Sequence, residues 1–171
     1  AATTTGSSID KRLIGLTGPG AVGQLIGQKE VIFATRENLV LKPGEGIALM
    51  SDASGDVDQY VKLFIEWDEE DSSPVAENEF MTSIGQINGS ASSNYVYAAF
   101  YNPPTSATTT LIKRLAIRVD SGAVATSVPF SLRLISTSSA GSLISASNIE
   151  KKNASSTNSI MEIRHTGVTV S

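Results

Sequence analysis

Apolar residues recur at every second position between residues 60 and 67 of the chain. The apolar set is Val61, Leu63, Ile65 and Trp67, and the residues between them are Lys62, Phe64 and Glu66. Successive side chains of a β-strand point to opposite faces, whereas a helix would scatter these residues around its axis. The segment therefore predicts a strand whose apolar face belongs to a protein core.

Several other segments show a strand-type pattern. In residues 111–119, the core face is expected to carry Leu111, Leu115, Ile117 and Val119. Further strands are expected at residues 31–35, 39–41, 47–50, 95–101, 130–134, 160–164 and 168–170. Turn-forming Gly, Pro, Asn and Asp separate these strands, and no segment sustains helical periodicity beyond about two turns. The pattern predicts an all-β fold, a single antiparallel β-sandwich that is jelly-roll-like.

Three segments lack this alternation. Residues 1–30 are expected to form a flexible or extended N-terminal arm, which leaves residues 31–171 as the β-sandwich domain. The acidic residues 68–71 follow a predicted strand and are interpreted as a solvated rim or a contact surface for a basic partner. Residues 136–159 are rich in Ser, Ala and Asn, and are expected to form a long loop with one weak strand at residues 143–144.

Composition and charge narrow the classes of partner. Hydrophobic residues make up 40% of the 171 residues and charged residues 18%, which is enough apolar material for a sizeable core. The formal net charge is −4 and the 13 basic residues are spread along the chain, so the sequence shows no basic patch of the kind that binds nucleic acid. No apolar run approaches the roughly 20 residues that span a bilayer. The absence of cysteine excludes disulfides, thiolate zinc sites and a cysteine nucleophile. We expect neither a nucleic-acid nor a membrane partner.

Three motifs that could carry chemistry have simpler explanations. Residues 18–23 match G-x-G-x-x-G, but too few residues follow for the crossover helix that a dinucleotide site needs. Asp52, Asp56 and Asp58 lack the spacing and the closing glutamate of a calcium-binding loop. His165 is the single histidine, and no nucleophile elbow accompanies it. We expect no enzyme activity, no cofactor and no metal.

One aromatic strand supplies a candidate interface or ligand face. Strand alternation places Tyr95, Tyr97 and Tyr101 on one side and Phe100 on the other. The three tyrosines could form a contact between subunits or a platform that stacks on a ligand ring. The alternative is that they pack against neighbouring strands within one subunit.

Two pieces of the chain resemble segments of small virion structural proteins of tailed bacteriophages. The first comprises residues 40–49, with Pro-Gly-Glu-Gly at their centre, and the aromatic-acidic stretch at residues 64–69. The second runs from residues 99–104, which end in an Asn-Pro-Pro turn, into the strands at residues 111–115 and 130–134. In those phage proteins the Asn-Pro piece comes first. The reversed order here fits a permuted domain, or strands that complete a neighbouring subunit.

The resemblance implies a β-sandwich on the exterior of a phage head, as a decoration, cement or fibre-base protein. Such a subunit is expected to bind the major capsid protein or neighbouring copies and to form homo-oligomers. Residues 1–30 and the aromatic strand at residues 95–101 are the expected contacts, through strand addition repeated over many copies. The alternative is a carbohydrate- or receptor-binding module, at a fibre tip or on an adhesin, that stacks a glycan on Tyr95 and Tyr97.

Overall fold

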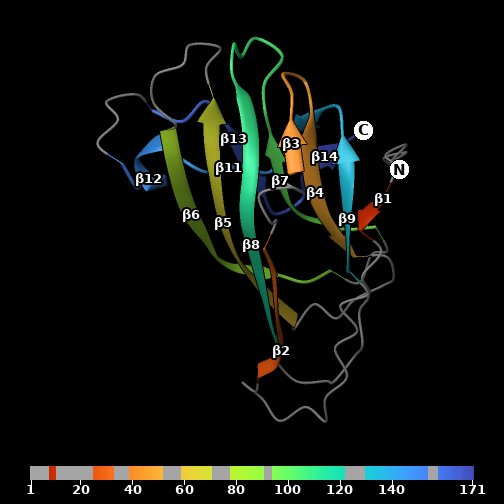
Figure 1. Cartoon of the computed structure of the whole chain (residues 1–171). Coiled ribbons are helices and arrows are strands. Elements are labelled where there is room, and N and C mark those ends of the chain that lie inside the picture. The colour runs from red at the N-terminus through yellow and green to blue at the C-terminus, as the bar shows by residue number, and fades with distance from the viewer. Residues whose placement is uncertain are drawn as a thin grey trace.

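The computed structural model describes residues 8–10, 25–32, 39–51, 59–70, 78–90, 94–121, 130–153 and 158–171. Within these ranges the chain forms fourteen β-strands and one 3-10 turn, which confirms the all-β prediction. Most of the strands belong to two antiparallel sheets that pack face to face (Figure 1).

Sheet A and sheet B are the two layers of the sandwich. In spatial order, sheet A consists of β1 (Ser8–Asp10), β9 (Phe130–Ile135), β4 (Gly46–Ser51), β7 (Val96–Tyr101), β13 (Glu162–His165) and β11 (Ser142–Leu143). Sheet B consists of β12 (Glu150–Lys151), β6 (Asn78–Asn88), β5 (Gln59–Glu70), β8 (Thr109–Ser121) and β2 (Leu25–Ile32), with β3 (Leu39–Leu41) also paired to β8. A separate two-stranded sheet is formed by β10 (Ser138–Ser139) and β14 (Thr169–Val170).

The strand order is that of a jelly roll. β2 and β3 pair with successive stretches of β8, so they count as one interrupted strand. β1 is then the first strand, β2 with β3 the second, and β4 to β9 the third to the eighth. In sheet A, the first, eighth, third and sixth strands (β1, β9, β4 and β7) lie side by side. In sheet B, the second, seventh, fourth and fifth strands (β2 with β3, β8, β5 and β6) lie side by side. Interleaving of this kind defines the double-sheet jelly roll. The predicted jelly-roll-like sandwich is therefore confirmed.

One hydrophobic core fills the space between the sheets. Its sheet B side includes the predicted core face of β5, and each of those four side chains is at most 2% exposed. Its sheet A side includes Ile47 and Leu49 of β4, Phe100 of β7 and Phe130 of β9. Burial of these apolar side chains, each contributing about 1.5–3 kcal/mol, is the main force holding the two layers together.

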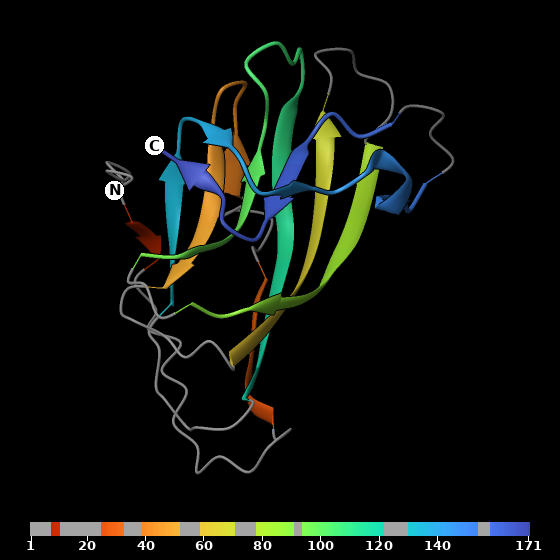
Figure 2. The ribbon, with the colours of Figure 1, turned by 180° about the vertical axis from the view of Figure 1, so that it is seen from behind.

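A second, smaller core covers the outer face of sheet A. It joins Ala48 and Met50 of β4 to Val168 and Val170 of the C-terminal segment, together with Val96, Ala99 and Ile135. Because sheet A is covered on both faces here, every residue of β4 and of β7 is buried. Figure 2, the view from behind, shows the C-terminal strand β14 in front of sheet A.

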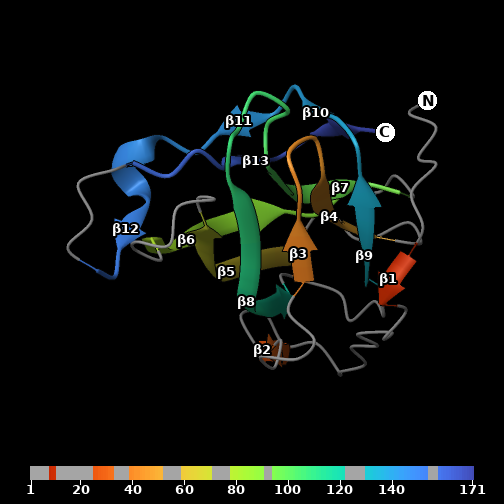
Figure 3. The same ribbon diagram turned by 45° about the horizontal axis from the view of Figure 1, so that its top comes forward.

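The C-terminal segment also connects the two sheets along one side of the sandwich. β11 pairs with β13 in sheet A, the 3-10 turn η1 (Ala146–Asn148) follows, and β12 then pairs with β6 in sheet B (Figure 3). The prediction of a long loop at residues 136–159 with one weak strand at residues 143–144 is thus partly confirmed: β11 lies at Ser142–Leu143, whereas β10 and β12 were not predicted. The backbone groups of this segment find partners on the edges of both sheets, which a sequence pattern does not show.

β6 has no counterpart among the predicted strands because a bulge breaks its alternation. Ile87 pairs with Val61 and Ile84 pairs with Leu63, so two residues of β6, Gly85 and Gln86, lie opposite one residue of β5. The buried Ile84 and Ile87 are consequently three positions apart instead of two.

A second bulge shifts the predicted core face of β8. Arg114 pairs with Glu66 and Ile112 pairs with Trp67, so that Lys113 is the extra residue of β8 at this bulge. Ile112 is therefore fully buried, and Leu111, which was predicted on the core face, is only half-buried. Leu115 lies in the core as predicted, with 0% exposure.

Two parts of the predicted N-terminal arm are paired into the sheets. β1 pairs with β9 at the edge of sheet A, and β2 pairs with β8 in sheet B. Residue 30 lies inside β2, so the structure does not divide the chain there into an arm and a domain. Residues 1–7 and 11–24 lie outside the described residues.

Candidate interaction surfaces

The three candidate tyrosines do not form one open face. Tyr97 is fully buried, with its ring centroid 5.1 Å from that of Tyr95 and 5.3 Å from that of Phe130. Tyr101 is 8% exposed, and its hydroxyl donates to the carbonyl oxygen of Ser136 at 3.1 Å. Tyr95 is half-buried and packs against the main core. Packing within one subunit therefore accounts for Tyr97 and Tyr101.

A bulge in β7 explains why simple alternation misplaced these rings. Ala98 pairs with Leu49 and Val96 pairs with Met50, so that Tyr97 is the extra residue. Tyr97 consequently turns into the main core together with Phe100, which was predicted to point the opposite way. Its hydroxyl has no hydrogen-bond partner among the described residues, and burial, followed by the neighbouring Tyr95, raises the pKa of Tyr97 to about 12.

The first two residues of the acidic run after Trp67 are buried and do not belong to a solvated rim. Asp68 and Glu69 are each 3% exposed and belong to β5, which continues to Glu70. The carboxylate of Glu69 accepts hydrogen bonds from Trp67 Nε1 at 3.1 Å and from the Ser159 hydroxyl. It also accepts from the backbone N–H of Ile160, at 3.1 and 3.2 Å to its two oxygens. Glu69 thus fixes the C-terminal segment against the end of the core.

The sequence contains a signal that Glu69 is buried, although the acidic residues around it indicate exposure. Glu69 continues the odd-numbered series that places Val61, Leu63, Ile65 and Trp67 in the core. A carboxylate at such a position must be hydrogen-bonded, because an unpaired buried charge is costly. Its partners Ser159 and Ile160 lie 90 and 91 residues away, and no local pattern identifies them.

A network of charged side chains lies on the outer face of sheet B. Lys152 contacts Glu66 at 2.7 Å and Glu79 at 2.8 Å, while Lys113 contacts Asp68 and reaches Glu79 at 3.6 Å. The hydrogen bond from Lys152 holds the pKa of Glu79 below its ordinary value. Hydrogen bonds to Glu66 and Glu79 hold the pKa of Lys152 above its ordinary value. The network ties β12 to β5 and β6, which is a structural role.

An open hollow of about 180 Å³ lies on sheet B, between β5 and β8. Its lining consists of Lys62, Leu63, Phe64, Ala116, Ile117 and Arg118. The guanidinium carbon of Arg114 lies 5.3 Å from the centroid of the Phe64 ring, which is a cation–π contact.

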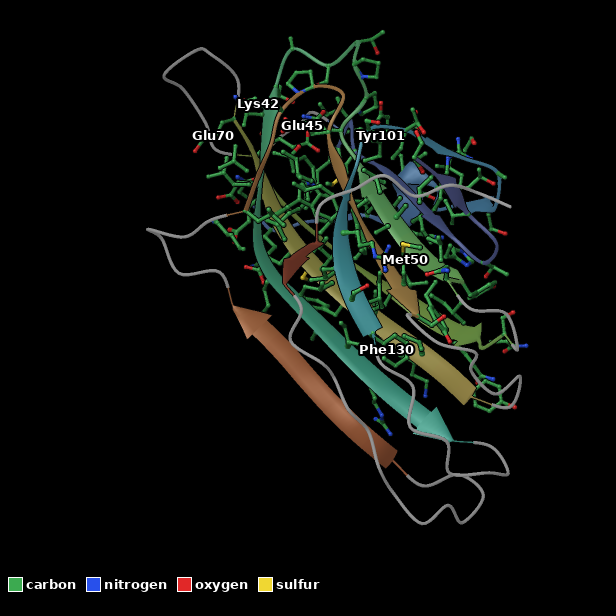
Figure 4. The ribbon with its side chains drawn as sticks, turned by 90° about the vertical axis from the view of Figure 1, so that its right-hand side faces the viewer. Lys42, Glu45, Met50, Glu70, Tyr101 and Phe130 are labelled. Carbon is green, nitrogen blue, oxygen red and sulfur yellow. The ribbon has the colours of Figure 1, made fainter. Side chains whose placement is uncertain are left out.

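The two pieces that carry the phage resemblance meet at one end of the sandwich. The N–H of Gly44 donates to the carbonyl oxygen of Asn102 at 2.8 Å, and the N–H of Asn102 donates to the carbonyl oxygen of Glu45 at 2.9 Å. The Asn102 side chain donates to the carbonyl oxygens of Leu41 and Thr108 and so joins sheet A to sheet B. Figure 4 shows Lys42 and Glu45 at this end, with Tyr101 beside them.

The remaining motifs do not assemble into a reactive site in the described part of the chain. Residues 18–23, Asp52, Asp56 and Asp58 lie outside the described residues. His165 lies on β13, where its Nδ1 is 2.9 Å from the Thr166 hydroxyl, and burial lowers the pKa of the imidazole. The described side chains contain no group of three or more His, Cys, Asp or Glu residues placed to hold a metal ion. Within the same ranges, no helix has the length and apolarity to cross a membrane.

Comparison of the chain with protein-family models, with curated proteins and with solved structures finds no match.

Proposed function

We propose that this chain is a non-enzymatic structural subunit of a virus particle, which acts through contacts with neighbouring copies and shell proteins. The observation that carries the proposal is the interleaved strand order of sheets A and B. Jelly rolls with this order are a recurrent architecture of viral capsid domains, and they also occur in lectins and cupins. Because one fold hosts several functions, the surface must decide between them.

The surface favours a role in assembly over the binding of a small ligand. A ligand platform would need aromatic rings that a sugar can reach, yet Tyr97 and Tyr101 are buried. The hollow on sheet B is open, and the described side chains that line it come from β5 and β8. A glycan-binding module is the second candidate, since lectins share the architecture, and Tyr95 is the half-buried ring that it would use.

The sequence resemblance supports a narrower proposal, a decoration, cement or fibre-base protein on the head of a tailed bacteriophage. The two pieces that carry it occur in reverse order along this chain. They nevertheless form a single cluster of turns, joined by the hydrogen bonds between Gly44, Glu45 and Asn102. A cluster of this kind keeps the same contacts whichever piece comes first in the chain, so the reversed order is compatible with this assignment.

Quantitative mass spectrometry of purified virus particles tests the proposal. Particles from the culture that produces the chain are banded on a density gradient, and the chain is counted against the major capsid protein. Copies in the hundreds support a place on the head lattice, and a few to some tens support a collar, fibre or tail. Absence from the particles overturns the proposal. Glycan binding that is lost in Tyr95→Ala and kept in Thr105→Ala would replace it with the second candidate.

A further inference from the structure

The outer edge of β6 is paired over only a small part of its length. β6 contains eleven residues, Asn78–Asn88, and β12 pairs with two of them, Phe80 and Met81. The Thr82 hydroxyl donates to the carbonyl oxygen of Asn148. From Ser83 to Asn88, no described strand lies beyond β6 in sheet B, as the views from both sides show (Figures 1 and 2).

This part of the edge also lacks the side chains that normally protect a sheet edge. Its exposed residues are Ser83, Gly85, Gln86 and Asn88. None of them is charged, and residues 80–112 contain no Asp, Glu, Lys, Arg or His at all. Exposed edges are usually blunted by Lys, by Pro, by inward-pointing charges or by bulges, because an unprotected edge accepts another strand. Of these devices, this stretch has the bulge at Gly85 and Gln86, which adds twist to the edge but no charge that would repel an added strand.

The other long edge strand of sheet B has a different character. The sequence of β2 contains two charged residues, Lys29 and Glu30, near its centre. At the far side of sheet A, β11 is only two residues long. At the near side of sheet A, β1 is three residues long. Among these described edges, the uncharged stretch of β6 is therefore the best suited to strand addition.

We infer that β6 pairs, antiparallel, with β6 of a second copy of this chain. A two-fold interface brings each residue near its own counterpart, so every charge at its centre meets a like charge. The uncharged run from residue 80 to residue 112 removes this repulsion. The pairing extends sheet B across the two copies, with the two-fold axis at Gly85 or Gln86, the middle of the open stretch. This inference deepens the proposed function, on which it rests for the identity of the partner.

Lysine substitutions on the edge test the pairing. Ser83→Lys with Gln86→Lys places like charges on both sides of the axis at exposed positions. We expect the dimer dissociation constant from sedimentation velocity to rise at least about tenfold. The matched control, Thr105→Lys with Ala107→Lys, adds the same charge on an exposed turn at the opposite end of the sandwich and should leave the constant unchanged. Circular dichroism and the melting temperature check that each variant is folded.

Disulfide trapping locates the contact directly, because the chain contains no cysteine. Single variants Gly85→Cys and Gln86→Cys put a thiol on the proposed axis, and an added Cβ at Gly85 meets no atom within 4 Å. Counterpart residues at the axis lie within the Cα separation of about 4.4–6.8 Å that a disulfide spans. We expect a covalent dimer under mild oxidation from at least one of them, and none from Thr105→Cys.

Two outcomes overturn the inference and are distinct from failure of the proposed function. If the chain associates but neither the lysine pair nor the cysteines affect or trap the dimer, β6 is not the interface, and the assembly role stands. If the chain is monomeric at every concentration and no cysteine variant is trapped, the pairing is also overturned. The count of copies in virus particles then decides the proposed function separately.

Discussion

Glu69 is the residue where composition and position point in opposite directions. It stands among acidic residues at the end of β5, yet its carboxylate lies inside the sandwich and is 3% exposed. Three donors, from Trp67, Ser159 and Ile160, replace the water that the carboxylate loses. Hydrogen bonds to a charged group are stronger than those between neutral groups, at about 1.5–3 kcal/mol each.

Removal of this carboxylate should destabilise the protein. Glu69→Ala leaves the Trp67 Nε1–H and the Ile160 N–H without their acceptor, and each buried donor left unpaired costs about 1–3 kcal/mol. Urea denaturation should show a lower free energy of unfolding. The control is Glu70→Ala, since Glu70 is exposed on the same strand and should change stability by no more than about 0.5 kcal/mol. Equal effects of the two substitutions would contradict the anchoring role of Glu69.

At the scale of elements, β12 is attached to sheet B by a short ladder and by Lys152. Two residues of β12 pair with β6, and the N–H of Lys152 donates to the carbonyl oxygen of Glu79 at 2.9 Å. The Lys152 side chain then contacts Glu66 and Glu79 on two neighbouring strands. An element with so few backbone pairs depends on such side-chain contacts to remain in place.

Lys152→Met should increase hydrogen exchange of the amides in β12 without unfolding the sandwich. The matched control is Lys151→Met, which removes an exposed charge from the same strand. Mass-spectrometric exchange at pH 7 should show faster exchange at residues 150–152 in the first variant only. Unchanged exchange in both variants would mean that the ladder alone holds β12.

The attachment of β12 should also depend on pH in a defined window. The pKa of Glu79 is lowered from 4.5, so its contribution is present above that value and is lost as the pH falls through the lowered pKa. The pKa of Lys152 is raised from 10.5, so its contribution is present below that value and is lost as the pH rises through the raised pKa. The stability difference between wild type and Lys152→Met should therefore be largest between these limits and shrink in acid. A difference that is constant from pH 3 to pH 8 would contradict this linkage.

At the scale of the whole molecule, a single continuous core joins sheet A, sheet B and the C-terminal segment. Met161 and Ile163 of that segment lie in the same cluster as the strands of both sheets. Leu115 lies in the same cluster, on β8 near the middle of sheet B. A defect at Leu115 should therefore affect the entire fold, because small single domains unfold cooperatively.

Leu115→Asp should unfold the protein. An unpaired carboxylate at a position with 0% exposure costs several kcal/mol or more, against a total stability of about 5–15 kcal/mol for a typical domain. Leu143→Asp is the control, since Leu143 is 54% exposed, and it should melt like the wild type. The measurement is thermal unfolding followed by circular dichroism. A Leu115→Asp variant that melts at the wild-type temperature would contradict the placement of β8 in the core.

The sequence by itself determined the fold class, most strand positions and the core face of β5. These follow from alternation over a few neighbouring residues, which local backbone geometry imposes on any strand with one buried face. Only the tertiary structure decided the bulges in β6, β7 and β8, and with them the side to which Tyr97, Ile112 and Ile87 point. It also decided that Glu69 is buried and that Lys152 attaches β12 to sheet B through its contact with Glu66. A bulge or a long-range contact depends on the register between strands that are distant in the chain, and no pattern within one strand carries that information.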